Sequence, residues 1–260
     1  MSGMTSSTPE AAGLTRADIV RIELALTRAW PPRETADIEG WIWRCSGGGT
    51  RRANSVLPIA FRGASIDRAI EAVEDRYRRQ HIRSYFQVIS QAEPADLDQR
   101  LAALGYAYEE PCLLLAKRLG AGAMPSDVAV MPAPSDAWLA IYTAPLTPDR
   151  RAAAPALLEV VPQRHAFLLA HAGGEPVTTA LGVVSPDGIA VVEAVATRAD
   201  RRRAGGGQRV MDALEAWAAG EGATIAALQV VDGNLPARRL YEQRGYAAVG
   251  AYHYRWRDVG

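Results

Sequence analysis

The stretch that decides the fold is residues 191–214, VVEAVATRADRRRAGGGQRVMDAL. Its first five residues include three valines, and β-branched residues favour a half-buried strand. An arginine- and glycine-rich segment at 201–207 then interrupts the apolar pattern. From Gln208 onward the apolar residues recur at helical spacing. The sequence therefore predicts a strand, a tight turn and a helix.

The turn has the composition of an anion-binding site. A helix N-terminus carries unpaired backbone N–H groups and a partial positive charge, and glycines let a phosphate approach the backbone closely. The spacings of a Rossmann loop and of a P-loop are both missing. The motif present is R-x-x-G-x-G, formed by Arg202, Gly205 and Gly207. A solvated turn that only caps the helix is the alternative.

This motif resembles the pyrophosphate-binding signature of the GNAT superfamily of acyl-CoA-dependent N-acyltransferases. A second motif of that family, N-x-x-A-x-x-L-Y followed by G-[FY], lies downstream and is formed by Asn234, Ala237, Leu240, Tyr241, Gly245 and Tyr246. The elements predicted between residues 128 and 256 follow the order β-α-α-β-β-β-α-β-α-β, which is also similar to that family. The resemblance therefore covers the second half of the chain.

The resemblance implies direct transfer of an acetyl group from acetyl-CoA, the co-substrate, to a primary amine, with no metal. Backbone N–H groups of Val195, Ala196 and Thr197 would contact the pantetheine and the developing oxyanion. Asn234 and Ala237 would hold the pantetheine arm, although Asn234 could also simply cap a helix. The residues implied for the pyrophosphate are Arg202, Arg203, Ala204, Gly205, Gly206, Gly207 and Gln208.

Two side chains are candidates for the chemistry. In the family, the residue at Tyr241 contacts the CoA sulfur and would protonate the departing thiolate, whereas packing in the core is the alternative. Alternation along the strand predicts that Glu193, Val195 and Thr197 share one face. Glu193 would then lie toward the acceptor and take the amine proton, directly or through water. A structural ion pair is the alternative for this carboxylate.

One position departs from the family pattern. Gly206 stands where a branched apolar residue is usual in the family. A glycine there is expected to pack against nothing and to make the turn harder to order. Weaker cofactor binding is the expected consequence.

The first half resembles a degenerate copy of the second. Its segment FQVI…LGY parallels LQVV…RGY, but it lacks R-x-x-G-x-G and has Leu101 or a neighbour in place of the tyrosine, so it is not expected to bind CoA. The expected fold class is α+β, with two GNAT-like units in tandem, each a mixed, mostly antiparallel twisted sheet flanked by helices. The expected organisation is a disordered tail at 1–13, a degenerate domain at 14–119, a linker at 120–126 and a catalytic domain at 127–260.

Other residues of the first half are candidates for an acceptor cleft. The patterns predict a hairpin in which 41–45 pairs with 52–57. Trp41, Trp43, Arg52 and Asn54 could line a cleft between the halves, and core packing of the tryptophans is the favoured alternative. His253, on the last predicted strand, could reach the acceptor or lie at the surface.

Composition limits the function classes. The formal net charge is zero, which argues against nucleic-acid binding. The two cysteines form no metal-binding motif and suggest a reducing compartment. No secretory signal or transmembrane segment is recognisable, so a cytoplasmic location without membrane contact is expected. The expected partner is a small-molecule amine or a protein amine, for a monomer or homodimer. A non-catalytic CoA-binding regulatory or scaffold protein is the alternative function.

Overall fold

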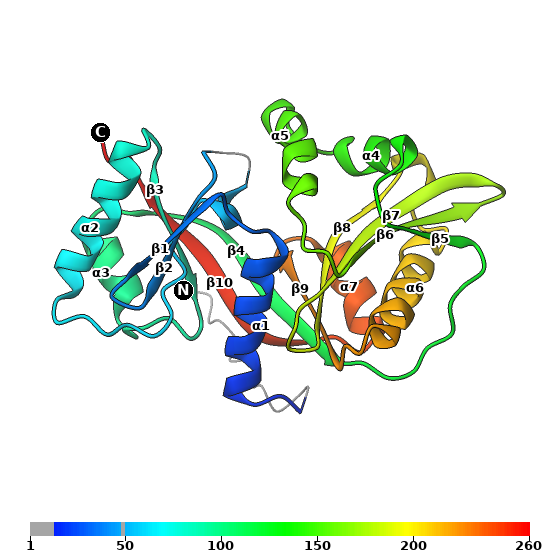
Figure 1. Cartoon of the computed structure of the whole chain (residues 1–260), viewed down its shortest axis with the longest axis horizontal. Helices are drawn as coiled ribbons and strands as arrows, with labels where there is room; N and C mark the ends of the chain where they lie inside the picture. The colour runs from blue at the N-terminus through cyan, green and yellow to red at the C-terminus, as the bar shows by residue number, and fades with distance from the viewer. Residues whose placement is uncertain (1–12, 48–49) are drawn as a thin grey trace.

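The computed structural model describes residues 13–47 and 50–260 of the 260-residue chain (Figure 1). The tail expected at 1–13 lies outside the described residues except for Gly13. Residues 48 and 49, which belong to the turn of the hairpin predicted between 41–45 and 52–57, lie outside them as well.

The described residues form one eight-stranded sheet and a separate two-stranded hairpin. Neighbouring strands of the large sheet are antiparallel except β8 and β9, which are parallel. The mixed, mostly antiparallel character that was expected is thus present. In spatial order the strands are β3 (Ser84–Ile89), β10 (Ala247–Arg257), β4 (Ala107–Arg118), β9 (Ile225–Val231), β8 (Ile189–Thr197), β7 (Glu175–Val184), β6 (His165–Ala172) and β5 (Val128–Met131).

The large sheet runs across the linker expected at 120–126. β4 precedes that segment, yet it pairs with β10 on one edge and with β9 on the other. In Figure 1 the green β4 and the red β10 run side by side through the middle of the molecule. The expectation of a separate sheet in each half is therefore wrong, because strands from the two halves alternate in one sheet.

Helices cover both faces of the part of this sheet that is formed by strands from the second half of the chain. On one face lie α1 (Arg16–Ala29), α4 (Asp136–Thr143) and α5 (Pro148–Glu159), whose buried residues share a core with alternate residues of the strands. On the other face lie α6 (Gly206–Gly220) and α7 (Leu235–Gln243). The site is built between these layers.

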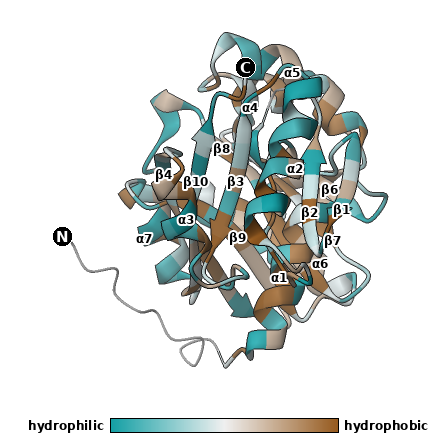
Figure 2. Ribbon diagram, turned by 90° about the vertical axis from the view of Figure 1, so that its left-hand side faces the viewer, coloured by the Kyte–Doolittle hydropathy of each residue, from teal (hydrophilic) through white to brown (hydrophobic). Residues whose placement is uncertain are grey.

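The first half has a core of its own. It is formed by the hairpin β1 (Glu34–Ile38) and β2 (Trp41–Cys45) with β3, α2 (Ile66–Arg79) and α3 (Leu97–Ala103). In Figure 2 the exposed side of α2 is hydrophilic, as expected for a helix that buries one face. The hairpin predicted between 41–45 and 52–57 is wrong. β2 pairs with β1 instead, Arg51–Ala53 form a 3-10 helix, and Leu57 keeps a single bridge to Ile42.

Candidate functional site

The site begins where two parallel strands separate. β8 and β9 are paired only over three residues each, and the last pair is Val191 with Ala227. Both strands continue beyond this pair, β8 to Thr197 and β9 to Val231. The backbone edges beyond the last pair therefore face a gap instead of each other.

A β-bulge in β8 sets which side chains face this gap. Ala194 has a φ of 52°, and the register with β7 shifts between Thr179 and Leu181, so that β8 carries one extra residue. The alternation expected through Glu193, Val195 and Thr197 is therefore wrong. Val195 and Thr197 line the main cavity, whereas Glu193 does not.

The N-terminus of α6 forms one end of the site. Its N-cap is Gly205, with a φ of 77°, and no side chain caps the first turn. Arg203, two residues earlier, also has a positive φ, of 62°. A left-handed residue next to a right-handed one turns consecutive backbone N–H groups toward a common concave surface, which favours anion binding.

Gly206 is closely packed in this turn. A Cβ atom on Gly206 would lie 2.3 Å from Oγ1 of Thr178, a buried residue of β7. That hydroxyl also lies 3.1 Å from Oγ1 of Thr197. The expectation that Gly206 packs against nothing is wrong, because the hydroxyl occupies the space that a side chain at 206 would take.

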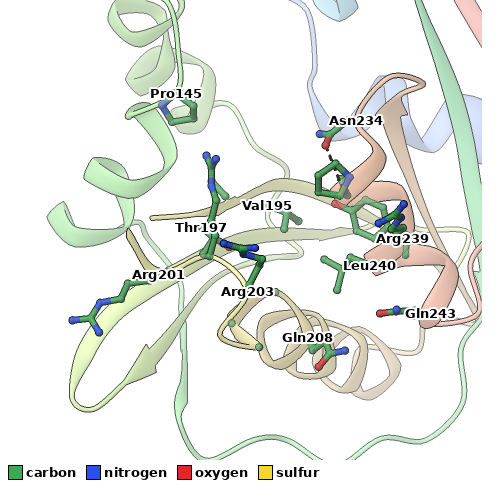
Figure 3. A pocket seen from close by; sticks show the side chains of 18 residues that line it. Pro145, Val195, Thr197, Arg201, Arg203, Gln208, Asn234, Arg239, Leu240 and Gln243 are labelled. Carbon is green, nitrogen blue, oxygen red and sulfur yellow. Dashed lines mark hydrogen bonds between the residues drawn. The ribbon is translucent and has the colours of Figure 1, made fainter. Parts of the chain in front are cut away.

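Positive charge surrounds the uncapped turn. Arg202 and Arg203 line the cavity and form no ion pair with another residue in the described part of the chain. Arg201 instead contacts Asp200, at 3.6 Å. Figure 3 shows the Arg201 side chain directed away from the other labelled residues, whereas Arg203 lies among them. Arg202 and Arg203 are thus the free cations beside the α6 N-terminus among the described residues.

The opposite wall comes from α7. Asn234 is its N-cap, and its Oδ1 accepts a hydrogen bond from the Ala237 N–H at 3.3 Å. Tyr241 is 7% exposed, and its ring packs against Tyr246 with centroids 5.9 Å apart. Burial, and then the charge of Glu193, raise the pKa of Tyr241 above its ordinary value. Its hydroxyl therefore stays protonated and can donate a hydrogen bond into the cavity.

These elements enclose a cavity of about 800 Å³ (Figure 3). Of the predicted residues, only Ala204 and Glu193 are missing from its lining. The predicted residues that line it are Val195, Ala196, Thr197, Arg202, Arg203, Gly205, Gly206, Gly207, Gln208, Asn234, Ala237 and Tyr241. The structure therefore brings two motifs together that lie more than twenty residues apart in the sequence.

Glu193 lies beside the cavity in an ion pair. It is 6% exposed, and both of its oxygens accept hydrogen bonds from Arg52, with Nη2 and Oε2 2.9 Å apart. Arg52 belongs to the first half, 141 residues earlier in the chain. The ion pair, which was the alternative for Glu193, is thus formed, and the role of Glu193 as base stays a prediction.

Comparison with known proteins places this geometry in a family. Residues 16–257 match the family model described as "Probable histone acetyltransferase Rv0428c C-terminal". The chain belongs to this acetyltransferase family. The GNAT resemblance inferred from the two motifs is thereby confirmed.

Two curated relatives support the assignment. An uncharacterised N-acetyltransferase of Bacillus subtilis, YobR, is 30% identical over 247 residues, 92% of this chain and 98% of the relative. The "Probable histone acetyltransferase Rv0428c" of Mycobacterium tuberculosis is 28% identical over 219 residues, 83% of this chain and 67% of the relative.

Solved structures show the same fold. A GCN5-related N-acetyltransferase from Kribbella flavida has a TM-score of 0.68 and 21% identity, over 90% of this chain and 94% of its own. A tandem GNAT protein from the clavulanic acid pathway has a TM-score of 0.61 and 14% identity, over 97% of this chain and 90% of its own.

Sequence reasoning missed part of the GNAT cavity. Leu240 was visible as a motif position but was not assigned to the site. The others occupy no motif position: Pro145 lies in the loop between α4 and α5, Arg201 ends the 3-10 helix before α6, and the remaining three lie on α7. The additional lining residues are Pro145, Arg201, Pro236, Arg239, Leu240 and Gln243.

The candidates for an acceptor cleft have different roles. Trp41 and Trp43 are buried in the core of the first half, which was the favoured alternative. Asn54 holds its own loop, since it accepts from the Ser46 N–H and donates to the Thr50 carbonyl. His253 contacts Asp98 and lines no part of the main cavity.

The described residues contain neither a membrane-spanning helix nor a cluster of metal-binding side chains. Among them, no helix has both the length and the apolar character needed to cross a bilayer. The same residues contain no group of three or more His, Cys, Asp or Glu side chains placed to hold a metal ion.

Proposed function

We propose that this protein transfers an acetyl group from acetyl-CoA to a primary amine by direct attack. The observation that carries the proposal is the single cavity that joins the uncapped N-terminus of α6 to the buried Tyr241 hydroxyl on α7. An anion site at one end and a proton donor at the other suit a long co-substrate with a phosphate end and a reactive end.

The residues present fit acetyl-CoA. Arg202 and Arg203, with the N–H groups of the first turn of α6, would hold the pyrophosphate. Gly207 leaves little room for a side chain, because a Cβ atom there would lie 3.0 Å from Leu240. The backbone of Val195 and Thr197, unpaired on the side of β9, would hold the pantetheine arm. When bound, acetyl-CoA supplies the thioester carbonyl that an amine attacks.

Two groups of the chain would move protons. Tyr241 keeps its proton because burial raises its pKa, so it can donate to the leaving sulfur and recover a proton from solvent. Glu193 lies close enough to affect the Tyr241 pKa. Because Arg52 occupies both Glu193 oxygens, the amine would lose its proton to this carboxylate through a water on a remaining lone pair.

Calorimetric titration with acetyl-CoA, followed by thiol release against a panel of amines, tests the proposal. We expect binding and amine-dependent release of CoA. Arg202→Ala should weaken acetyl-CoA binding about tenfold, because a charge-assisted contact is lost. Arg68→Ala is the control, because it changes an exposed arginine on α2 that does not line the cavity, and it should change the affinity less than about twofold.

Two results would contradict the proposal. No heat of binding at millimolar acetyl-CoA would exclude the cavity as its site. Binding without thiol release for any amine would instead support a non-catalytic CoA-binding regulatory or scaffold protein.

A further inference from the structure

A second, small cavity lies on the first-half side of Glu193. It is enclosed by the end of α1, by residues 50–52 and by α4 and α5, and it has a volume of about 20 Å³. Its apolar lining consists of Leu146 and Leu157. Each polar side chain that lines it can donate a hydrogen bond. Among the described residues, no carboxylate lines the cavity. The polar side chains are Trp30, Thr50, Arg52, Tyr142 and Arg150.

Trp30, which lines this cavity, has a buried hydrogen-bond donor without a partner among the described residues. Its side chain is 5% exposed, and its indole Nε1 has no hydrogen-bond partner among the described residues. An indole nitrogen can only donate, and a buried donor without a partner is destabilising. Trp30 Nε1 is therefore free to donate to an acceptor that is not among the described residues.

The two arginines of this cavity differ in their charge balance. Arg52 is neutralised by Glu193, whereas Arg150 is exposed at the rim and forms no ion pair within the described ranges. Burial raises the pKa of Tyr142, so its hydroxyl also remains a donor. The cavity thus combines one uncompensated positive charge with several donors, which is the complement of a small anion.

The small cavity lies beside the ion pair of Arg52 and Glu193. Arg52 lines the small cavity and holds Glu193, whose charge contributes to raising the Tyr241 pKa. The loop between α4 and α5 borders both spaces, with Pro145 on the main cavity and Leu146 on the small one. A group bound in the small cavity would thus lie on the other side of Arg52 from an amine placed at Glu193.

We infer that the acceptor is a small amine that carries a carboxylate, with the carboxylate bound between Trp30 Nε1 and Arg150 and the amine directed toward Glu193. The inference rests on the proposed acetyltransferase function. A water molecule needs about 10–15 Å³ of such space, so the cavity has room for one carboxylate oxygen, and the rest of the acceptor would lie outside it. Arg150 would supply the positive charge for the carboxylate, and Glu193, which is already paired with Arg52, would take the amine proton through a water.

Rates of CoA release test this with glycine, β-alanine and γ-aminobutyrate, each compared with its own carboxamide. The amides keep the amine and the chain length but lose the charge. For at least one pair we expect kcat/KM to be about tenfold higher for the acid, because charged hydrogen bonds are lost in the amide. Arg150→Gln should bring this ratio close to one by raising KM for the acid, and Arg150→Lys should keep most of it.

Two further variants distinguish loss of a contact in the cavity from a general loss of structure or activity. Trp30→Phe keeps the ring but removes the N–H, and it should lower the ratio about threefold, as expected for one hydrogen bond. Arg68→Gln changes an exposed arginine on α2 outside the cavity, and it should leave the ratio unchanged. Calorimetric titration of acid and amide into the CoA complex gives a second readout that needs no turnover.

The outcomes distinguish this inference from the proposed function. Equal kcat/KM for acids and amides, equal affinity for both in the CoA complex, or a ratio insensitive to Arg150→Gln would overturn it while acetyl transfer stands. Acetylation of other amines but of none of these acids would also overturn it. Failure to bind acetyl-CoA would instead remove the proposed function itself.

Discussion

Two segments of the molecule share one plan and differ in what they bind. β3–α3–β4 in the first half and β9–α7–β10 in the second each run strand, helix, strand. Each helix is followed by a glycine with positive φ, Gly105 at 83° and Gly245 at 82°. In each, the tyrosine after that glycine donates its N–H to a carbonyl five residues back, Tyr106 to Leu101 and Tyr246 to Tyr241.

The equivalent hydrogen bonds align Leu101 with Tyr241. Leu101 is fully buried in the core of the first half, whereas Tyr241 lines the main cavity. The helices that precede the segments differ too. Ser65 caps α2 by accepting from the Arg68 N–H, but Gly205 leaves α6 without a side-chain cap. The same order of elements therefore has a helix N-terminus capped by a side chain in the first half, and an uncapped helix N-terminus that can bind an anion in the second.

The largest effect is expected at the ion pair of Arg52 and Glu193, which connects the two halves. Arg52→Gln leaves the Glu193 carboxylate buried without its partner, which should lower the free energy of unfolding by about 3–5 kcal/mol. Urea unfolding measures this. Replacing both residues by leucine should restore most of the stability, because no charge is then left unpaired. A loss below about 1 kcal/mol in Arg52→Gln would show that the pair does not couple the halves.

A second buried glutamate provides a contrast with Glu193. Glu23 on α1 is 2% exposed, and burial raises its pKa from 4.5 to about 7, although the charge of Arg44 opposes the shift. The folded state then binds more protons than the unfolded state between these pH values, so its stability should fall as pH rises from 4.5 through 7. The loss should reach about 3 kcal/mol by pH 8.

Unfolding of Glu23→Gln between pH 5 and pH 8 checks this contrast. The variant lacks the titrating group, so its stability relative to the native chain should rise with pH. A difference that is constant with pH would contradict the raised pKa.

The third prediction concerns the open helix end. Gly206→Ala places a Cβ atom against Thr178 Oγ1 and should destabilise the fold by about 2 kcal/mol, with weaker acetyl-CoA binding. Thr178→Ala in the same chain should relieve the clash and recover much of both losses. Thermal unfolding and calorimetry measure them. Gly206→Ala with native stability would show that the turn can move away from Thr178.

The smallest effect is expected at Tyr241, which aligns with Leu101 of the first half but carries a hydroxyl. Tyr241→Phe should lower kcat about tenfold and change the acetyl-CoA affinity little, because the ring stays and only the proton donor is lost. Leu101→Met, at the equivalent position of the first half, is the control and should leave kcat unchanged. Unchanged turnover in Tyr241→Phe would remove this residue from the role of acid.

Local signals in the sequence predicted much of the fold. Thr15 as a cap, an apolar face of helical period over 16–29 and Pro31-Pro32 after it predict a helix, and the structure forms α1 there, with a capping box between Thr15 and Asp18. β1 was missed, because its sequence ETADI has little of the β-branched and alternating character that marks a strand. Without β1, 52–57 became the apparent partner of β2.

The site, too, has parts that the sequence predicted and parts that it did not. The glycine turn and the α7 motif are each contained in a short stretch of sequence. The spacing of residues within each stretch therefore revealed the main cavity. The ion pair of Arg52 with Glu193 joins residues 141 apart, and the bulge at Ala194 changes the face of β8 that carries the carboxylate. Neither leaves a periodic pattern, so only the folded chain shows them.

The position of β10 also affects how the chain is made. This strand pairs with β3 on one edge and with β4 on the other, and both of those strands leave the ribosome more than a hundred residues earlier. Until residues 247–257 emerge, the nascent chain carries two strands with open hydrogen-bonding edges, which other nascent chains can pair with. Premature termination in the second half would therefore yield aggregation-prone fragments rather than a folded first half.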